Sequence, residues 1–439
     1  LLLSTDSLVN YPYYTTGLFE IDLLGKIYYE YLIDGGYHHD YYEMENGNLL
    51  VLSNNLSDGT VEDYIVEIDR KNGNIVNTID LTTILPQEEG KSANSTEYDW
   101  FHNNSIWYDK NTNQILLSGR HQDIVVSLDY TTKKINYIIG DPTNWSSEYQ
   151  KYFLTPTNNL EWQYASHAAK ILPNGDISLF DNGVNRSKEE KNYLKAENNY
   201  SRGVIYRVDK ENMTITQIYQ YGKERGSSYY SPYISDMDYL NDGHYLIHSG
   251  GISYKNGQIL NVPASLGEAD TLKSITTEIL NNEVIFEIEL PTNNYRSEKM
   301  PLYQKDNYHP TEGITLGSFN KTETSKNQVP LIKYKKENDT YNKYNIVIEK
   351  ETNRLAITGT FSKNDKVKII LDKFLGKKTY DFIISTRPYT AMCVDTFNNN
   401  KEEKLTLTKY INNTTLNGKY SIYIYINGTV YKTNYYVTF

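Results

Sequence analysis

The sequence predicts an all-β protein, a six-bladed β-propeller followed by a smaller C-terminal β-sandwich of the immunoglobulin-like kind. Three observations predict it. Short strand–turn–strand units recur along much of the 439-residue chain, 43 tyrosines far outnumber 11 phenylalanines, and no helix of ordinary length stands out. Because tyrosine favours strands and keeps a polar tip, its abundance suits sheets with half-buried faces.

Two kinds of hairpin alternate over the first 290 residues. One kind recurs five times, at residues 17–33, 64–81, 124–140, 204–222 and 275–290. A second kind precedes four of these units, so that each pair supplies four antiparallel strands. Repetition of four strands is the unit of a propeller blade. Part of residues 292–340, which lose the pattern, is expected to complete a sixth blade together with the N-terminal strands.

The sequence pattern changes at Tyr344, and seven short segments beyond it are typical of strands. Their number and spacing are those of a β-sandwich. We therefore predict a catalytic propeller domain at residues 1–340 and a sandwich domain at residues 341–439.

Composition excludes several classes of partner. The net charge is −11 and no long basic run is present, which argues against nucleic acid and anionic membranes. No apolar stretch approaches the roughly 20 residues that span a bilayer. The single cysteine, Cys393, excludes an intrachain disulfide and a CxxC-type metal site.

The hairpins share a register that places histidine at the start of the innermost strand. His39 and His167 each lie eight residues before a turn glycine, Gly47 and Gly175. His102 precedes a longer turn but begins its hairpin at the same place. In the fourth repeat the matching residue is Ser235. Three successive blades therefore repeat a histidine at one position, which favours function over chance.

The second strand of each hairpin adds a further polar position. Asn54 and Asn182 each follow their histidine by 15 residues, and Arg120 follows His102 by 18 because that turn is three residues longer. Asn104 shares a strand face with His102, since strand side chains alternate. Innermost strands line the channel of a propeller, so one mouth is expected to carry five catalytic candidates: His39, His102, Asn104, Arg120 and His167.

This residue set suits transfer of an anionic group without a metal. Neutral imidazole is a nucleophile and an acid or base, and arginine with neutral donors stabilises the charge on transferring oxygens. We expect no metal, although three histidines could bind zinc. A non-catalytic propeller that binds anionic or aryl ligands and a sulfo- or phospho-ester hydrolase are the alternatives. The other histidines are expected to be structural, with His121 pointing away from the site: His121, His244, His248 and His309.

Several separated motifs resemble one enzyme family. DWFHNNSIWYD, ILLSGRHQD, YHHDYYEMENGNLLVL and SHAAKILPNGDISLFDNG resemble the bacterial arylsulfate sulfotransferases that use no nucleotide sulfate donor. The resemblance runs from Tyr11 to Tyr303. It implies a six-bladed propeller in which a central histidine is transiently sulfated. A sulfuryl group passes from an aryl sulfate to this histidine and then to a phenol, in a ping-pong reaction without a cofactor.

The resemblance assigns roles residue by residue. The sulfated histidine falls on His167, and His102, Asn104 and Arg120 would hold the sulfuryl oxygens. The remaining family histidine falls on His39. Whether His39 or His102 is the general acid and base stays open. Four further residues are weaker candidates for substrate binding: His38, Asn54, Asn182 and Ser235.

The resemblance also implies a periplasmic or extracellular location and allows a homodimer. Better-known family members carry an N-terminal β-domain, whereas here a predicted β-domain follows the propeller. This departure concerns any dimer interface taken over from the family and leaves the predicted site unaffected. The natural donor and acceptor are not implied beyond an aryl sulfate and a phenol.

Overall fold

The computed structural model describes most of the chain as strands. The described residues are 2–8, 15–21, 27–55, 57–300, 313–318, 332–333, 344–351, 354–362, 365–373, 376–382, 404–412 and 416–439. The chain divides into two compact units, a large one built on Ile33–Pro301 and a small one that combines Leu1–Leu32 with most of the chain beyond Leu302. The predicted domain boundary at residue 340, His309 and Cys393 lie outside the described residues.

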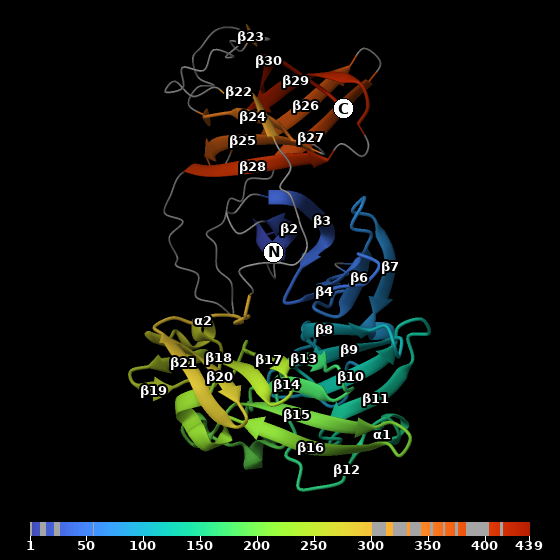
Figure 1. Ribbon diagram of the computed structural model, residues 1–439, viewed down its shortest axis with the longest axis vertical. Helices are drawn as coiled ribbons and strands as arrows, with labels where there is room; N and C mark the ends of the chain where they lie inside the picture. Colours follow the sequence, from blue (N-terminus) through green and yellow to red (C-terminus); the bar gives the residue numbers. More distant parts are fainter. Residues whose placement is uncertain are drawn as a thin grey trace. The chain divides into compact units, whose positions relative to one another are not determined.

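The large unit contains four antiparallel sheets that follow one another in chain order (Figure 1). The first two consist of β4 (Tyr41–Glu43), β5 (Leu49–Ser53), β6 (Tyr64–Ile68) and β7 (Ile75–Asp80), then β8 (Asn103–Asp109), β9 (Gln114–Gly119), β10 (Ile124–Asp129) and β11 (Ile135–Gly140). In each sheet the strands pair in sequence order. The predicted pairing of two hairpins into four strands is therefore confirmed for both repeats.

The next two sheets repeat this arrangement with additions at their edges. The third holds β13 (His167–Ile171), β14 (Ile177–Asp181), β15 (Arg202–Asp209) and β16 (Thr214–Tyr221), with β12 (Thr155–Pro156) parallel to β16. The fourth holds β17 (Asp236–Asn241), β18 (His244–Lys255), β20 (Thr271–Leu280) and β21 (Glu283–Leu290), with β19 (Gln258–Ile259) on β18. The all-β class is confirmed, and the number of six blades stays a prediction.

Helical elements in the described chain are all short. They are η1 (Leu81–Thr83), α1 (Ser147–Gln150), η2 (Glu190–Asn192), η3 (Ala196–Asn198), η4 (Lys223–Tyr229) and α2 (Ala264–Gly267). No helix among the described residues has both the length and the apolar character needed to cross a membrane.

Hydrophobic clusters join each sheet of the large unit to the next. Leu52 and Ile65 of the first sheet pack with Ile106 and Leu117 of the second. A second cluster joins the second and third sheets, and a third cluster joins the third and fourth. Because both faces of the central strands are covered, β5, β9 and β14 are buried along their whole length. This face-to-face packing brings the first strands of successive sheets together.

The small unit consists of two sheets over one core, with a third sheet at the N-terminal end. One sheet has the order β22 (Gly313–Ser318), β24 (Val347–Glu351), β25 (Arg354–Ser362) and β28 (Lys404–Asn412). The other has the order β23 (Ile332–Lys333), β30 (Thr429–Thr438), β29 (Lys419–Ile426), β26 (Val367–Lys373) and β27 (Gly376–Phe382). Ile348 and Ile357 of the first share a hydrophobic cluster with Ile369 and Ile424 of the second. The immunoglobulin-like assignment stays a prediction.

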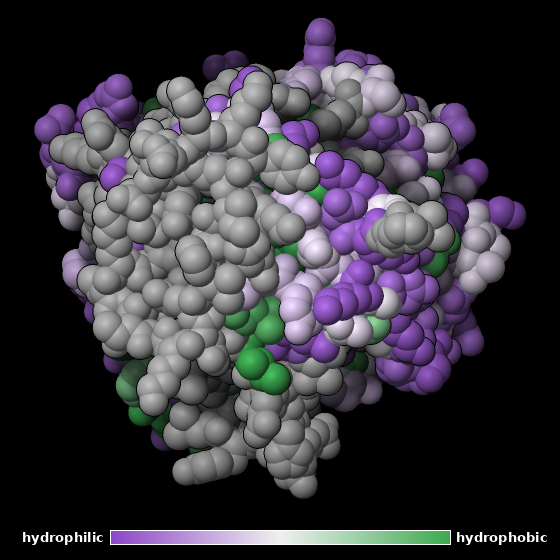
Figure 2. All heavy atoms as spheres, turned by 90° about the horizontal axis from the view of Figure 1, so that it is seen from above, coloured by the Kyte–Doolittle hydropathy of each residue, from purple (hydrophilic) through white to green (hydrophobic). Residues whose placement is uncertain are grey.

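The N-terminal strands form a separate antiparallel sheet of β1 (Leu2–Leu8), β2 (Thr15–Ile21) and β3 (Ile27–Tyr37). The division between the units falls within β3, whereas the predicted propeller domain contains all of these strands. The predicted domain limits therefore stay a prediction. On the face that Figure 2 shows, the described residues are mainly hydrophilic, with hydrophobic residues confined to small areas.

Candidate active site

Three histidines lie at or just before the first strands of the first three sheets, as the hairpin register predicts. His167 is the first residue of β13, His102 directly precedes β8, and His39 lies two residues before β4. His39 and His102 have positive φ angles of 50° and 55°, and Ser235 before β17 has 89°. For residues other than glycine such conformations are strained by roughly 1–3 kcal/mol. His167 itself has no positive φ, but the next residue, Ala168, has a φ of 55°, so each of the four strand starts contains one such residue.

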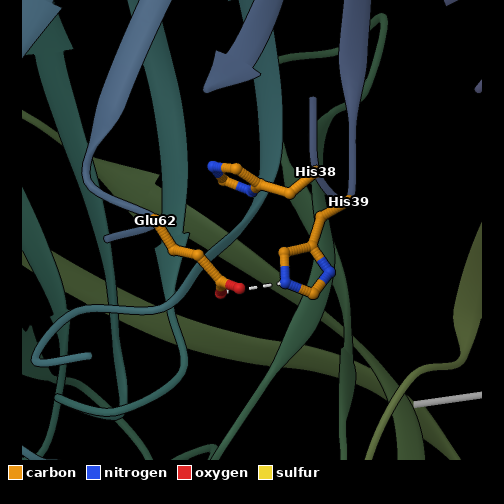
Figure 3. A group of neighbouring side chains, drawn as sticks. All are labelled: His38, His39 and Glu62. Carbon is orange, nitrogen blue, oxygen red and sulfur yellow. Dashed lines mark hydrogen bonds and ion pairs between the residues drawn. The ribbon is translucent and has the colours of Figure 1, made fainter. Parts of the chain in front are cut away.

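One carboxylate joins two of these histidines. Glu62 Oε2 lies 3.0 Å from His39 Nε2 and 2.7 Å from His102 Nδ1, and the two rings are 4.8 Å apart. Figure 3 shows the Glu62 carboxylate facing the ring of His39. Burial raises the pKa of Glu62, but the neighbouring His102 and His39 hold it well below its usual range. Glu62 is therefore an anion between two imidazoles.

His102 contacts a second carboxylate. Asp99 Oδ2 lies 2.8 Å from His102 Nδ1, the same nitrogen that faces Glu62. Burial lowers the pKa of His102, but the carboxylates of Glu62 and Asp99 outweigh it and raise this pKa to about 9. His102 is therefore an imidazolium at neutral pH. No hydrogen bond from another described residue engages its Nε2, so this nitrogen remains available to a ligand.

His39 differs because both of its ring nitrogens are bound within the protein. Nε2 faces Glu62, and Nδ1 lies 2.7 Å from the hydroxyl of Tyr295. Tyr295 follows the fourth sheet, 256 residues farther along the chain. This contact joins the start of the first sheet to the segment that follows the fourth sheet.

Arg120 directly follows β9 and is buried, with 5% exposure. Its Nη1 donates to His121 Nε2 over 2.8 Å, and its Nη2 donates to Pro232 O over 3.3 Å. Since His121 Nε2 accepts, the proton of this ring is on Nδ1, which donates to Asp99 O over 2.8 Å. Burial lowers the pKa of His121, so it is a neutral support for Arg120.

The position of His121 corrects one expectation. The alternation of strand side chains predicted that it points away from the site, because it is adjacent to Arg120. Its ring instead lies 4.5 Å from the ring of His102, and it binds the guanidinium of Arg120. The alternation fails because β9 ends at Gly119, so both residues lie in the turn beyond the strand.

His167 is buried beside these groups, with 2% exposure. Its Nδ1 lies 2.8 Å from Asn182 Oδ1 and 3.2 Å from Ala165 O. Burial, and after it the charge of Arg120, holds the pKa of His167 well below its usual range. The imidazole is therefore neutral, and it lies within the electrostatic range of a guanidinium.

Asn104 links the second and third sheets next to His167. Its Nδ2 donates to Ser166 O over 2.7 Å, and its side chain is fully buried. Its Oδ1 has no hydrogen-bond partner among the described residues. The five residues predicted to be catalytic thus lie in one hydrogen-bonded and electrostatic neighbourhood. Their catalytic roles stay predictions.

The four weaker candidates all have protein partners. Asn54 donates to Gly35 O over 2.8 Å and accepts from the Glu62 amide over 2.7 Å. Ser235 Oγ accepts from the Gly250 amide over 2.9 Å. His38 Nε2 donates to Ser53 O over 2.8 Å, and burial lowers the pKa of His38 to about 4. Asn182 binds His167. The substrate-binding role of each stays a prediction.

Sequence reasoning missed Glu62, Asp99 and Tyr295. The three-residue spacing of Asp99 and His102 could have suggested that pair, but Glu62 and Tyr295 lie 23 and 256 residues from His39 without any motif. His244 and His248 bind Glu278 and Thr276 on the fourth sheet, as expected of structural histidines.

Two groups of side chains have donor atoms close enough to be considered for a metal. They are His38 with His39 and Glu62, and Asp99 with His102 and His121, and within each group the donor atoms lie within 4.8 Å of one another. The hydrogen bonds and ion pairs described above already account for most of these atoms. The expectation of a metal-independent site therefore stays a prediction, which metal removal can test.

Comparison with known proteins gives a family match over much of the chain. The model of the arylsulfotransferase (ASST) family matches residues 3–304. Two curated relatives, both called arylsulfate sulfotransferase AssT, come from Lelliottia amnigena and Escherichia coli O6:H1. Both are 27% identical to this chain. The matches cover 51% and 53% of this chain and 47% and 48% of the relatives. The chain thus spans about half the length of the curated relatives it matches.

Solved structures are less similar. A protein of unknown function from Bacteroides caccae matches with a TM-score of 0.34 and 11% identity, covering 63% of this chain and 76% of that chain. The hydrazine synthase of Kuenenia stuttgartiensis matches with a TM-score of 0.32 and 12% identity. The match covers 78% of this chain and 70% of the synthase chain. At such scores these likenesses carry no argument about function.

Proposed function

The chain belongs to the arylsulfotransferase family, and on this premise we propose that it transfers a sulfuryl group from an aryl sulfate ester to a phenol. The transfer is a ping-pong reaction through sulfated His167 and uses no nucleotide sulfate donor. One observation carries the proposal: the buried imidazole of His167 is neutral and lies within the electrostatic range of the buried guanidinium of Arg120. A neutral nitrogen can attack an electrophile, and a fixed cation stabilises the negative charge on the transferring oxygens.

In the first half-reaction His167 Nε2 attacks sulfur in line with the leaving phenolate. The bond between nitrogen and sulfur forms while the bond between sulfur and the aryl oxygen breaks. Arg120 and the amide of Asn104 hold the sulfuryl oxygens. The leaving oxygen takes a proton, so that a neutral phenol departs and His167 is left as a sulfo-imidazolium.

We assign the proton donor to His102 rather than to His39. His102 is cationic between Glu62 and Asp99, and its Nε2 has no partner among the described residues. Both ring nitrogens of His39 are bound, to Glu62 and to Tyr295. His102 therefore gives its Nε2 proton to the leaving phenolate and keeps the Nδ1 proton. In the second half-reaction Nε2 takes the proton of the acceptor phenol as the sulfuryl group leaves His167.

The reaction needs no external source of energy. The group moves from one aryl oxygen to another, so donor and product are esters of the same kind and the equilibrium is near balance. A periplasmic or extracellular location and a homodimer remain expectations that the family resemblance alone supports.

Release of nitrophenol from nitrophenyl sulfate tests the proposal. The rate is measured with and without added phenol, in EDTA and without any nucleotide. We expect release that depends on phenol and yields one phenyl sulfate for each nitrophenol. Release at the same rate without phenol would indicate a hydrolase, and no release in either condition would indicate a protein that only binds such ligands.

A further inference from the structure

We propose that Asn182 is a positioning residue that keeps the proton of His167 on Nδ1 and so leaves Nε2 as the attacking nitrogen. The inference rests on the proposed function, because it names the reacting atom of the same site. The role of Asn182 in substrate binding stays a separate prediction.

The amide of Asn182 has only one orientation that satisfies its neighbours. Its Nδ2 lies 2.8 Å from Ser231 O and 2.9 Å from Ile234 O. Both neighbours are carbonyl oxygens that only accept, so the NH₂ group must face them. The opposite end of the amide, Oδ1, therefore faces His167. The side chain is fully buried, so water does not compete for these contacts.

This orientation determines which nitrogen of His167 carries the proton. Asn182 Oδ1 lies 2.8 Å from His167 Nδ1 and can only accept, so Nδ1 must be the donor. Ala165 O, 3.2 Å away, is a second acceptor for the same nitrogen. A neutral imidazole with its proton on Nδ1 has its lone pair on Nε2. No other described residue forms a hydrogen bond with Nε2, which leaves the lone pair for the substrate.

The neutral amide of Asn182 suits sulfated His167, because this intermediate must release its sulfuryl group to the acceptor phenol. When Nε2 binds sulfur, the ring becomes cationic while Nδ1 keeps its hydrogen. The Asn182 oxygen stabilises this charge through a hydrogen bond, which is weaker than the bond that a carboxylate would make. A carboxylate would hold the sulfo-imidazolium more tightly and slow transfer to the acceptor phenol.

The chain contains its own control for this contact. Asn54 occupies the same register in the first sheet, 15 residues after His39. It binds Gly35 O and the amide of Glu62 instead of the histidine. Substitution of Asn54 is therefore expected to leave the tautomer of His167 unchanged.

The test combines nitrogen NMR with kinetics on the full chain. Histidines are labelled with ¹⁵N, and His167 is identified from its absence in His167→Gln. In the wild-type protein we expect the proton of His167 on Nδ1. In Asn182→Leu we expect a mixture of tautomers and a kcat that is about 10- to 100-fold lower with KM nearly unchanged, because an orienting hydrogen bond is lost. Asn54→Leu should keep the wild-type signal of His167.

The conservative variant Asn182→Asp separates orientation from charge. One carboxylate oxygen keeps an acceptor for Nδ1, although the other loses the two hydrogen bonds that the amide donates to Ser231 O and Ile234 O. The tautomer should therefore be retained while the negative charge raises the pKa of His167. The acid limb of the pH profile then moves to higher pH, and trapped sulfated protein persists longer.

A proton on Nε2 in the wild-type protein would overturn the inference, as would an unchanged tautomer in Asn182→Leu. If Asn182→Leu does not fold, the nitrogen signals of His167 in the wild-type protein and in Asn182→Asp still show which nitrogen carries the proton. Absence of sulfuryl transfer in every protein would refute the proposed function, whereas the tautomer would still decide the role of Asn182.

Discussion

Glu62 Oε2 lies 2.7 Å from Nδ1 of His102, on the opposite side of the imidazole ring from the Nε2 that we assign to proton transfer. This carboxylate also faces His39 over 3.0 Å. Glu62 therefore stabilises the positive charge of His102 and also orients the ring of His39.

Replacing Glu62 should move the pH dependence of transfer. The Glu62 and Asp99 carboxylates raise the pKa of His102 to about 9, so the imidazolium donor persists to alkaline pH in the wild-type protein. In Glu62→Gln one of these charges is removed, and the alkaline limb of the kcat profile should shift to lower pH. Glu67→Gln, which changes a glutamate of β6 outside the site, should keep the wild-type profile.

The same pKa shift predicts a dependence of stability on pH. The folded-state pKa of His102, about 9, lies above the ordinary histidine value of 6.5, so protonation stabilises the folded protein. This stabilisation is complete below about pH 6.5 and is lost as the pH rises through 9, and it amounts to on the order of 3 kcal/mol. Denaturant unfolding from pH 6 to 10 should show the loss. If the free energy of unfolding falls as steeply with pH in His102→Gln, the loss of stability does not come from His102.

His167→Ala should remove transfer almost completely, because His121, the other neutral imidazole next to Arg120, has both ring nitrogens bound, to Arg120 and to Asp99 O. Loss of a nucleophile lowers kcat by about 10⁴-fold or more. The variant should also fail to accumulate sulfated protein when donor is added without acceptor, as mass spectrometry would show. His244→Gln, a change on the fourth sheet where His244 binds Glu278, should remain active and become sulfated. Transfer near the wild-type rate in His167→Ala would require another nucleophile.

Arg120→Met should reduce kcat more than it raises KM, since the guanidinium stabilises charge that develops during transfer. Removal of one such stabilising group costs about 10²- to 10³-fold in kcat. Arg207→Met, which removes an arginine that pairs with Asp176 away from the site, is the control. A matching loss in both variants would point to general destabilisation.

Metal removal should leave activity unchanged. The carboxylates of Glu62 and Asp99, which are possible metal ligands, already form ion pairs with Nδ1 of His102. Activity after dialysis against EDTA, compared with zinc content by elemental analysis, tests this. Activity that rises and falls with bound zinc would favour a metal centre at His38, His39 and Glu62.

Sequence periodicity was sufficient for the repeating part of the fold. Alternating hairpins predicted the four-stranded sheets, and their register predicted that His39, His102 and His167 begin successive innermost strands. These features depend on spacing along one hairpin, because turn length and strand alternation are local. Strand alternation applies only within a strand, so the predicted orientation of His121 was wrong because β9 ends at Gly119.

The sequence by itself determined which residues share one register in successive hairpins, and the tertiary structure decided which neighbours each of them contacts. Asn54, Arg120 and Asn182 share one register, yet they bind the Glu62 amide, His121 and His167. Glu62 and Tyr295 come from distant segments, and the tautomers of His121 and His167 follow from carbonyl and amide groups that only folding brings near. Charge and proton position depend on such neighbours across sheets, so no local pattern in the chain can encode them.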